Sequence, residues 1–581
     1  MRSYLPAIAV IVLAVLALHG RSVNYGLMLD DNNHRAELRA GDWSLRSLVE
    51  ASHLGGPRRR VQMWWQNQAD QYFFRPFAFL LMRLEYVVGH WRPAAMHGFS
   101  LVWTAINALL VVLLARSAGT GVVWATLAGL LFVVHPANVL TTQWIACQNE
   151  QMAAAFVLAG LWCYARHAGW RWDHQSQSAS AAGGPGWLVA ALLGFAAALL
   201  CRENGLVFVP LAALGDWLLR LGGLRRRRLV YLCVLAMTVG YLVVRHVALG
   251  GFAPIGPPYA YLPSTPGFTR FVIDKFLYYL LGLFAYLPII GFAGLDVLRD
   301  QPAAFYGGFA VLASLWATLL IWLRPPKVVW LWLALATIPL VPVLPVFASS
   351  HHLYMASSGA VLAVVALGQA IWQLASRFQS RAAGRWAKAM VATALGLYFA
   401  AGAGLNVLNG QTVAGFTALS ESPAIEAAEL GGPYRPGDRL FFINLPPLGF
   451  NCVPAIEETT GVAPLTGYVL TFSSDFMGMN RPGYLQRVGD RQLRVWLDGD
   501  GYFAGLMGRS MLEAIGRSTP WAVGERFSTL DFQIEVTRGS RSGVREFRFT
   551  FNRPLADPSY HFFFGSPQFT AYPLRFDQAH N

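Results

Sequence analysis

The chain has 581 residues, of which 55% are hydrophobic and only 13% are charged, and this is too apolar for a soluble globular protein. Its formal charge of +14 is carried outside residues 410–581, which hold fifteen Arg against seventeen Asp and Glu. Because the remaining basic residues cluster in short loops, they indicate membrane orientation and give no reason to expect nucleic acid. The five Cys have no spacing typical of metal ligands. We therefore predict a polytopic α-helical membrane protein in a lipid bilayer.

The first predicted element is an apolar helix at 5–19, preceded by Arg2. It is similar to a signal peptide, but no small-x-small cleavage site precedes Gly20, so we expect an uncleaved signal anchor. A membrane span needs about 20 apolar residues. On this basis about eleven crossings are predicted, at 5–19, 97–115, 122–136, 150–166, 187–201, 204–219, 229–248, 305–323, 329–346, 354–375 and 389–408.

Basic residues in the loops predict the orientation. If all of them are cytoplasmic, the N-terminus is cytoplasmic and the C-terminal region extracytoplasmic. A crossing at 271–293 would place Arg324 and Lys327 outside, so we expect this apolar segment to be re-entrant or to lie against the outer face, broken near Pro288. Arg-rich and Ala/Gly-rich usage is typical of a high-GC genome, which predicts a bacterial inner membrane. The loop residues used are Arg116, Arg166, Arg171, Arg225 to Arg228, Arg324, Lys327, Arg377, Arg381, Arg385 and Lys388.

Two long stretches lie outside the membrane in this scheme. The first external loop, 20–96, is predicted to carry interfacial helices at 42–50 and 75–90, with an extra crossing at 75–90 as the alternative. Residues 174–186 read as a flexible cytoplasmic linker. We predict a transmembrane domain at 1–409 and an extracytoplasmic (periplasmic) α/β or mainly β domain at 410–581. Its expected strands are 439–444, 468–472, 493–497, 532–536 and 546–551.

The predicted topology gathers polar side chains at the outer ends of the spans. Asp30 and Asp31 directly follow the first span. A single polar residue there could be structural, since a buried His is often a satisfied core residue. Acids, Arg and His at one face of a bundle together predict a polar cavity. Its expected members are Asp30, Asp31, Arg75, His97, His135, Glu150, Arg202, Glu203, His351, His352 and Tyr354.

Such a cavity suits transfer of a group from a lipid carrier. A carboxylate can take a proton from an acceptor hydroxyl or hold a divalent cation, and Arg and His can neutralise a phosphate leaving group. Outside the cytoplasm neither ATP nor a nucleotide sugar is available, so the expected donor is a sugar on a polyprenyl phosphate. Displacement in line would invert the sugar carbon.

Five motifs in order over residues 1–410 resemble the GT-C class of integral-membrane glycosyltransferases. The similarity is to protein O-mannosyltransferases and to transmembrane tetratricopeptide-repeat O-mannosyltransferases. The matching positions are Leu29-Asp30-Asp31; Phe74-Arg75-Pro76-Phe77 with Gly89, Pro93, His97 and Asn107; His135-Pro136 with Trp144-Ile145 and Glu150; Leu199-Leu200-Cys201-Arg202-Glu203 with Pro210; and His352-Leu353-Tyr354 through Gly359.

The resemblance implies a polyprenyl- or dolichyl-phosphate-linked donor and an acidic catalytic residue in the first external loop. We expect Asp31 to be the base, with Asp30 as the alternative and Mg²⁺ or Mn²⁺ as a cofactor of the pair if a metal is used. Arg202, His352 and Arg75 are expected at the donor phosphate, with Glu203 orienting Arg202. The remaining cavity residues are Glu203, His97, His135, Glu150, His351 and Tyr354.

The sequence also departs from the family. His352 stands where an Arg is expected, residues 138–142 lack a His and a Glu, and the C-terminal region has no tetratricopeptide pattern. A lipid or glycan transporter and a catalytically inactive scaffold for envelope assembly therefore stay as alternatives. The sequence names neither the sugar nor the acceptor, which could be a protein, a glycan or a lipid.

Overall fold

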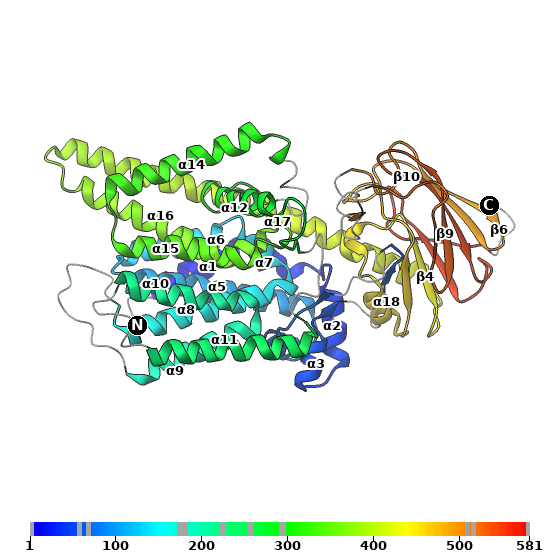
Figure 1. Cartoon of the computed structure of the whole chain (residues 1–581), viewed down its shortest axis with the longest axis horizontal. Coiled ribbons are helices and arrows are strands. Elements are labelled where there is room, and N and C mark those ends of the chain that lie inside the picture. The colour runs from blue at the N-terminus through cyan, green and yellow to red at the C-terminus, as the bar shows by residue number, and fades with distance from the viewer. Residues whose placement is uncertain are drawn as a thin grey trace.

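A computed structural model gives the fold of the chain. It describes residues 5–54, 61–65, 71–170, 184–219, 228–251, 260–289, 295, 298–505, 508, 511–512, 517 and 519–576. Most of the predicted linker at 174–186, together with Arg171 and Arg225 to Arg227, lies outside these residues. Figure 1 shows a helical region joined to a C-terminal region of β-sheet, with α2, α3 and α18 at the junction.

All eleven predicted spans are helical. Two are interrupted: η5 precedes α10, and η7 follows α15 where Pro339 and Pro342 remove backbone donors from the α-helix. The helices are α1 (Leu5–His19), η2 (Gly20–Asn24), α5 (Pro93–Ser117), α6 (Val122–Val134), α7 (Asn138–Gln143), η4 (Ile145–Cys147), α8 (Gln148–Ala168), α9 (Pro185–Cys201), η5 (Glu203–Val207), α10 (Phe208–Leu219), α11 (Arg228–Leu249), α12 (Phe268–Ala285), α14 (Pro302–Leu323), α15 (Lys327–Thr337), η7 (Ile338–Val343), η8 (Ser350–Leu353), α16 (Tyr354–Ala375) and α17 (Arg381–Leu430).

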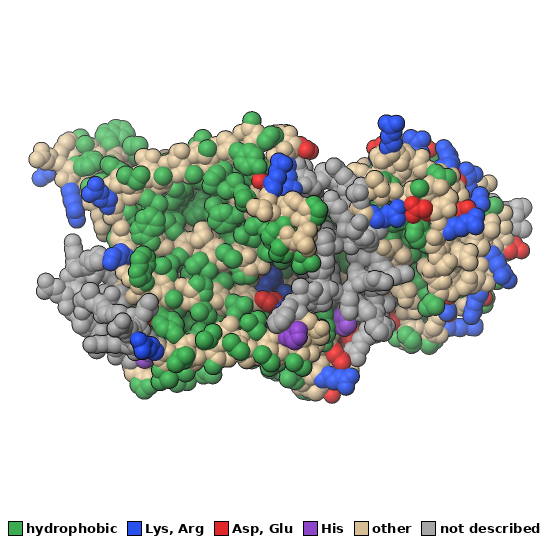
Figure 2. Space-filling model, viewed as in Figure 1, with side chains coloured by type: hydrophobic (Ala, Val, Ile, Leu, Met, Phe, Trp, Pro, Cys, Tyr) green, Lys and Arg blue, Asp and Glu red, His purple; other side chains and the backbone are tan. Residues whose placement is uncertain are grey.

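Six helices in the described part of the chain are long and apolar enough to cross a membrane. Figure 2 agrees with this, because the visible face of the helical region is mainly hydrophobic whereas the C-terminal region carries charged side chains. In the segment predicted at 271–293, residues 271–285 belong to α12, which ends at Ala285, before Pro288, while 290–293 lie outside the described residues and the re-entrant course stays a prediction. The six stretches are Leu5–Asn24, Pro93–Ser117, Arg228–Leu249, Pro302–Leu323, Ser350–Ala375 and Arg381–Leu430, and the shorter apolar helices are Val122–Val134, Pro185–Cys201 and Lys327–Val343.

The first external loop is more helical than expected. Residues after Asp30 form α2 (Asp31–Ala40), which buries Leu38, where only a loop was predicted. The helix expected at 42–50 is α3 (Leu45–Glu50), and its N-cap is Ser44, whose hydroxyl accepts the Ser47 N–H at 3.2 Å. The predicted second helix is α4 (Pro76–Val88). Its 13 residues span only about 20 Å, less than the hydrocarbon core of a bilayer.

The C-terminal region consists of two five-stranded sheets packed face to face. One is antiparallel, in the order β6-β7-β10-β9-β8, and the other is mixed, in the order β12-β11-β4-β5-β2. Aromatic side chains fill the space between them, with Phe441 against Phe532 at 5.9 Å between ring centroids. All five predicted strands are present. The elements are β4 (Arg439–Ile443), η9 (Pro447–Gly449), α18 (Val453–Thr460), β5 (Thr466–Val469), β6 (Gly483–Gly489), β7 (Gln492–Leu497), β8 (Arg526–Ser528), β9 (Phe532–Gly539), β10 (Val544–Phe551), β11 (Tyr560–Phe564) and β12 (Tyr572–Leu574).

One strand of the mixed sheet comes from the first external loop. β2 (Val61–Met63) pairs in parallel with β5, while β1 (His53–Leu54) and β3 (Gln71–Tyr72) form a separate ladder. Trp64 follows β2, is 5% exposed, and donates its indole N–H to the carbonyl of Leu470 at 2.9 Å. The helix α17 continues through residue 410 without a break. The division at 409/410 stays a prediction, but the external loop and the C-terminal region share one hydrophobic core.

Candidate active site

The acidic loop, residues 25–31, lies between α1 and α2 and is held by backbone hydrogen bonds. Leu29 has a φ of 49°, an uncommon left-handed conformation for a residue with a side chain, and it directly precedes Asp30. Asp31 is 1% exposed, and its two oxygens accept the N–H groups of Met28 at 2.9 Å and Ala146 at 2.7 Å. Asp31 therefore ties the loop to the turn before α8.

The two acids have different environments. Asp30 is half-buried, and its Oδ1 accepts a hydrogen bond from the Asn451 amide at 3.3 Å. Burial raises the pKa of Asp30 to about 6, while the Asn451 amide and the charge of Arg75 oppose this shift. Burial raises the pKa of Asp31 further, to about 8, against the effect of the two backbone N–H groups. At neutral pH, Asp30 is the ionised member of the pair.

A network of charged side chains lies beside the loop. Arg202 places Nε 2.6 Å from Glu150 Oε2 and donates Nη1–H to Asn149 at 2.7 Å. Glu150 is thus a carboxylate in direct contact with Arg202, while Arg202 also acts electrostatically on Glu203, so the orienting role of Glu203 stays a prediction. Asn204 supplies a second hydrogen bond to Glu150, at 3.1 Å.

Glu203 instead faces two other guanidinium groups. Arg75 Nη2 is 3.5 Å from one of its oxygens, and Arg245 Nε is 3.8 Å from the other. With Arg202 and Glu150, the network contains three guanidinium groups and two carboxylates. The Nε–H of Arg75 is buried and has no hydrogen-bond partner among the described residues. A buried donor without an acceptor fits an anionic ligand.

The two adjacent histidines, His351 and His352, are held by α12 and by the turn before them. Tyr279 on α12 contacts His352 Nδ1 at 2.9 Å, and the Ser349 hydroxyl contacts His351 Nδ1 at 2.7 Å. Arg75 and Arg202 lie close enough to act electrostatically on both rings. The structure thus brings His351 and His352 toward the arginine network.

The other predicted residues have structural contacts. His97 Nε2 lies 3.0 Å from the carbonyl of Gly26 and so supports the acidic loop. Both ring nitrogens of His135 are used within the protein, at the carbonyl of Leu283 and the N–H of Ala137. Tyr354 is fully buried at the start of α16, with its ring against Phe132.

The described residues alone do not form a metal site. No group of three or more His, Cys, Asp and Glu side chains in this part of the chain is placed to hold an ion. Asp30 and Asp31 provide two carboxylates, but both oxygens of Asp31 already accept backbone hydrogen bonds. A Mg²⁺ or Mn²⁺ ion here would need further ligands from a phosphate substrate and water, and metal dependence stays a prediction.

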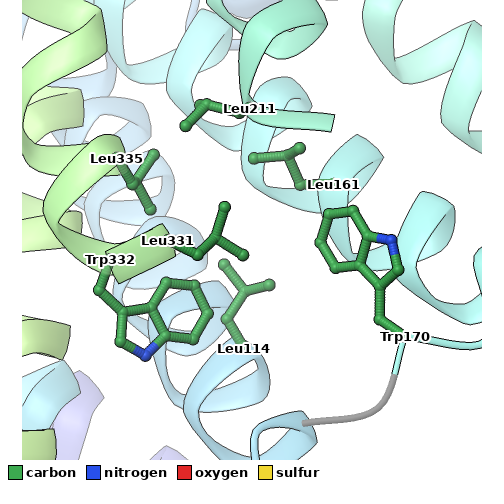
Figure 3. A pocket seen from close by; sticks show the side chains of 7 residues that line it. All are labelled: Leu114, Leu161, Trp170, Leu211, Leu331, Trp332 and Leu335. Atoms are coloured by element: carbon green, nitrogen blue, oxygen red, sulfur yellow. The ribbon is translucent and has the colours of Figure 1, made fainter. Parts of the chain in front are cut away.

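A small pocket elsewhere in the helical region is entirely apolar. Figure 3 shows that leucine and tryptophan side chains from α5, α8, α10 and α15, and from the turn after α8, line it. Leu114 lies at the end of α5 opposite His97, so the pocket is far along the helices from the acidic loop. Its lining residues are Leu114, Leu161, Trp170, Leu211, Leu331, Trp332 and Leu335.

The chain is similar to known proteins over part of its length. No protein-family model matches the chain. Among curated proteins it matches protein O-mannosyl-transferase Tmtc2 of Drosophila melanogaster, with 29% identity over 255 residues. The chain resembles GT-C membrane glycosyltransferases of the O-mannosyltransferase type. The match to Drosophila Tmtc2 covers 42% of this chain but only 25% of the Drosophila protein. The match to tmtc2 of Xenopus laevis is 28% identical and covers 25% of this chain and 16% of the Xenopus protein.

Two solved structures align with most of the chain at low identity and with TM-scores below 0.5. ArnT from Cupriavidus metallidurans bound to undecaprenyl phosphate is 16% identical, with a TM-score of 0.42 over 81% of this chain and 86% of that chain. AglB from Archaeoglobus fulgidus, in complex with an inhibitory peptide and a dolichol-phosphate, is 13% identical, with a TM-score of 0.40 over 79% and 64%.

Three residues near the site were not predicted. Arg245 lies near the end of an apolar span, and a charge in such a position is a sequence signal for a functional site. Lys275 is fully buried on α12 and donates to the carbonyls of Val343, Val346 and Phe347. Asn451 lies more than 400 residues from Asp30 in the chain, and no local pattern links the two.

Proposed function

We propose that the chain is an inverting glycosyltransferase that moves a sugar from a polyprenyl-phosphate-linked donor to an acceptor hydroxyl outside the cytoplasm. The observation that carries the proposal is a network of three guanidinium groups and two carboxylates, with a buried, unpartnered Arg75 Nε–H, in which Arg75 lies near enough to act electrostatically on Asp30 of the acidic loop. The resemblance to O-mannosyltransferases supports glycosyl transfer as the reaction class.

Asp30 is the base in this proposal. It is more exposed than Asp31, and its pKa of about 6 leaves it ionised at neutral pH yet basic enough to accept a proton. Asp31 is a positioning residue, because its oxygens are already occupied by the N–H groups of Met28 and Ala146. This reverses the order expected from the sequence, where Asp31 was preferred.

The reaction is a single displacement at the sugar's anomeric carbon. The acceptor oxygen forms the new glycosidic bond while its proton passes to Asp30. The bond from the anomeric carbon to the phosphate oxygen breaks, and its electron pair leaves with the polyprenyl phosphate. Arg75, with Arg202 and Arg245 behind it, stabilises the charge that grows on that phosphate. His351 and His352 would lie along the same phosphate side.

The test uses the full chain in lipid nanodiscs with radiolabelled polyprenyl-phosphate mannose and an extract of envelope acceptors. We expect Asp30→Asn to lower transfer by at least about 100-fold, with normal membrane insertion and donor binding. Asp42→Asn changes an exposed acid in the same external loop and is the matched control. Arg75→Gln should weaken donor binding.

Other outcomes separate the alternatives. An unchanged product from Asp30→Asn would rule out this acid as the base and would remove the main support for the proposal. Wild-type protein that binds donor but transfers no sugar would indicate a scaffold. Movement of the carrier lipid across the bilayer without transfer would indicate a transporter. Mass spectrometry of envelope glycans with and without the chain would identify the sugar and the acceptor.

A further inference from the structure

We propose that the C-terminal region forms part of the active site, with Asn451 as a positioning residue for the Asp30 carboxylate and Ser420 and Glu421 as a clamp on the acidic loop. This rests on the proposed function. It assigns to the C-terminal region a role in the chemical step, in addition to any role in acceptor recognition.

The clamp comes from the last turns of α17. Glu421 accepts the N–H of Leu27 at 3.0 Å, and the Ser420 hydroxyl accepts the N–H of Leu29 at 2.8 Å. Ser420 in turn donates to the carbonyl of Leu448, in the segment after β4, at 2.9 Å. The hydroxyl therefore links the acidic loop to η9 of the C-terminal region through a single atom.

The fit between clamp and loop is close. A Cβ added to Gly26 would lie 1.6 Å from Glu421 Oε1, so any larger residue at this position must displace the Glu421 side chain. Leu29, held by Ser420, has the left-handed φ of 49° that directly precedes Asp30. A left-handed backbone conformation is unfavourable for a residue with a side chain and persists only where its surroundings hold it. The strained residue thus lies between the clamp and the proposed base.

Asn451 reaches the carboxylate from the other side. It precedes α18, is 6% exposed, and donates to Asp30 Oδ1 at 3.3 Å. Glu458 on α18 contacts Arg35, and lies 2.8 Å from Arg39, both on the helix that begins at Asp31. Figure 1 shows α2 and α18 at the junction of the two regions. The loop, Asp30 and the following helix are thus all contacted by residues between 420 and 458.

The hydrogen bond from Asn451 has a chemical consequence. An amide that donates to a carboxylate favours its ionised form, which is the form a base requires. The charged groups around the loop are Arg75 before α4, Asp31 and Arg35 on α2, Glu421 on α17 and Glu458 on α18. Asn451 is an uncharged donor among them, so its removal takes a hydrogen bond from the Asp30 carboxylate without changing the net charge around it.

The decisive measurement is the pH dependence of transfer. In Asn451→Ala we expect the acidic limb of kcat/KM to move to higher pH by about one unit, with donor binding unchanged. Asn451→Asp is nearly isosteric, adds a like charge, and should move the limb further in the same direction. Asn480→Ala changes an exposed Asn of the same region that is hydrogen-bonded to Ser474 and Asp475, and it should leave the limb in place.

A double-mutant cycle tests the clamp. Gly26→Ala and Glu421→Ala both remove the Glu421–Leu27 contact, so their losses of kcat should be much less than multiplicative in the double variant. KM for donor should stay constant in each, because the clamp does not touch the phosphate side.

The outcomes are distinguishable from those of the proposed function. An acidic limb that stays in place in both Asn451 variants, with Asp30→Asn inactive, would overturn this inference and leave the proposed function standing. An active Asp30→Asn would overturn both. Variants are compared only as monodisperse protein with wild-type donor affinity, so that a folding defect is not counted as a loss of base function.

Discussion

The variant Asp31→Asn tests whether the acid at position 31 has a structural or a catalytic role. The wild-type carboxylate is 1% exposed and accepts two backbone N–H groups, from Met28 and Ala146. An Asn side chain offers one oxygen, so one N–H loses its acceptor and faces an amide NH₂ group. A buried donor left without a partner costs about 1–3 kcal/mol. Asp31→Ala removes both acceptors and should cost roughly twice as much. Asp30→Asn loses one long hydrogen bond at a half-buried position, which we expect to cost less than about 1 kcal/mol.

The assay is thermal unfolding of the full chain in detergent, followed by tryptophan fluorescence across pH. The folded pKa of Asp31 is about 8, above the unfolded value near 4. The contribution of protonated Asp31 to the free energy of unfolding is thus fully present below about pH 4 and is lost as the pH rises toward 8. The gap in melting temperature between wild type and Asp31→Asn should therefore be widest in acid and narrow toward pH 8. A variant that melts like wild type at low pH but transfers no sugar would refute the structural role.

Three further results are expected. The kcat/KM for transfer should rise with pH through about 6 and level off above it, because Asp30 must lose its proton, and a pH–rate profile measures this. Glu150→Gln removes the carboxylate 2.6 Å from Nε of Arg202, whose side chain is 9% exposed, and should cost about 3 kcal/mol or more in thermal unfolding, with partial recovery in Glu150→Gln/Arg202→Gln. Trp64→Ala leaves a cavity in the core between the sheets and should lower the free energy of unfolding by about 3–5 kcal/mol. This loss should be seen as faster proteolysis of the C-terminal region. Trp43→Ala, at a half-exposed residue, should change the proteolysis rate little.

Local patterns in the sequence located the helices of the eleven apolar runs and five of the strands. Apolar runs found every predicted span, since hydropathy over a helix length reports the bilayer directly. Alternating apolar residues found β7, where Leu493, Val495 and Leu497 are buried. The helix α2 was missed because it is short and polar, and it is stabilised by contacts with α18 that no local pattern contains.

The site was predicted by residue type more successfully than by partner. Four members of the network, Arg75, Glu150, Arg202 and Glu203, were named from span ends and do lie together, whereas Arg245 was not named. Their pairing depends on side-chain direction across several helices, and the contact of Arg202 with Glu150 joins residues 52 positions apart in the chain. The contact of Asn451 with Asp30 joins distant parts of the chain and could be found only in three dimensions.

The strand at residues 61–63 also limits how this protein can be recombined. It supplies an outer strand of the C-terminal sheet from the first external loop, and the Trp64 that follows it lies in the shared core. A chimera that receives residues 431–576 from another protein would lack a matching strand and anchor unless 61–65 were exchanged with them. The helical region and the C-terminal region are therefore expected to be inherited together. An engineered exchange of the C-terminal region should include residues 61–65 as well.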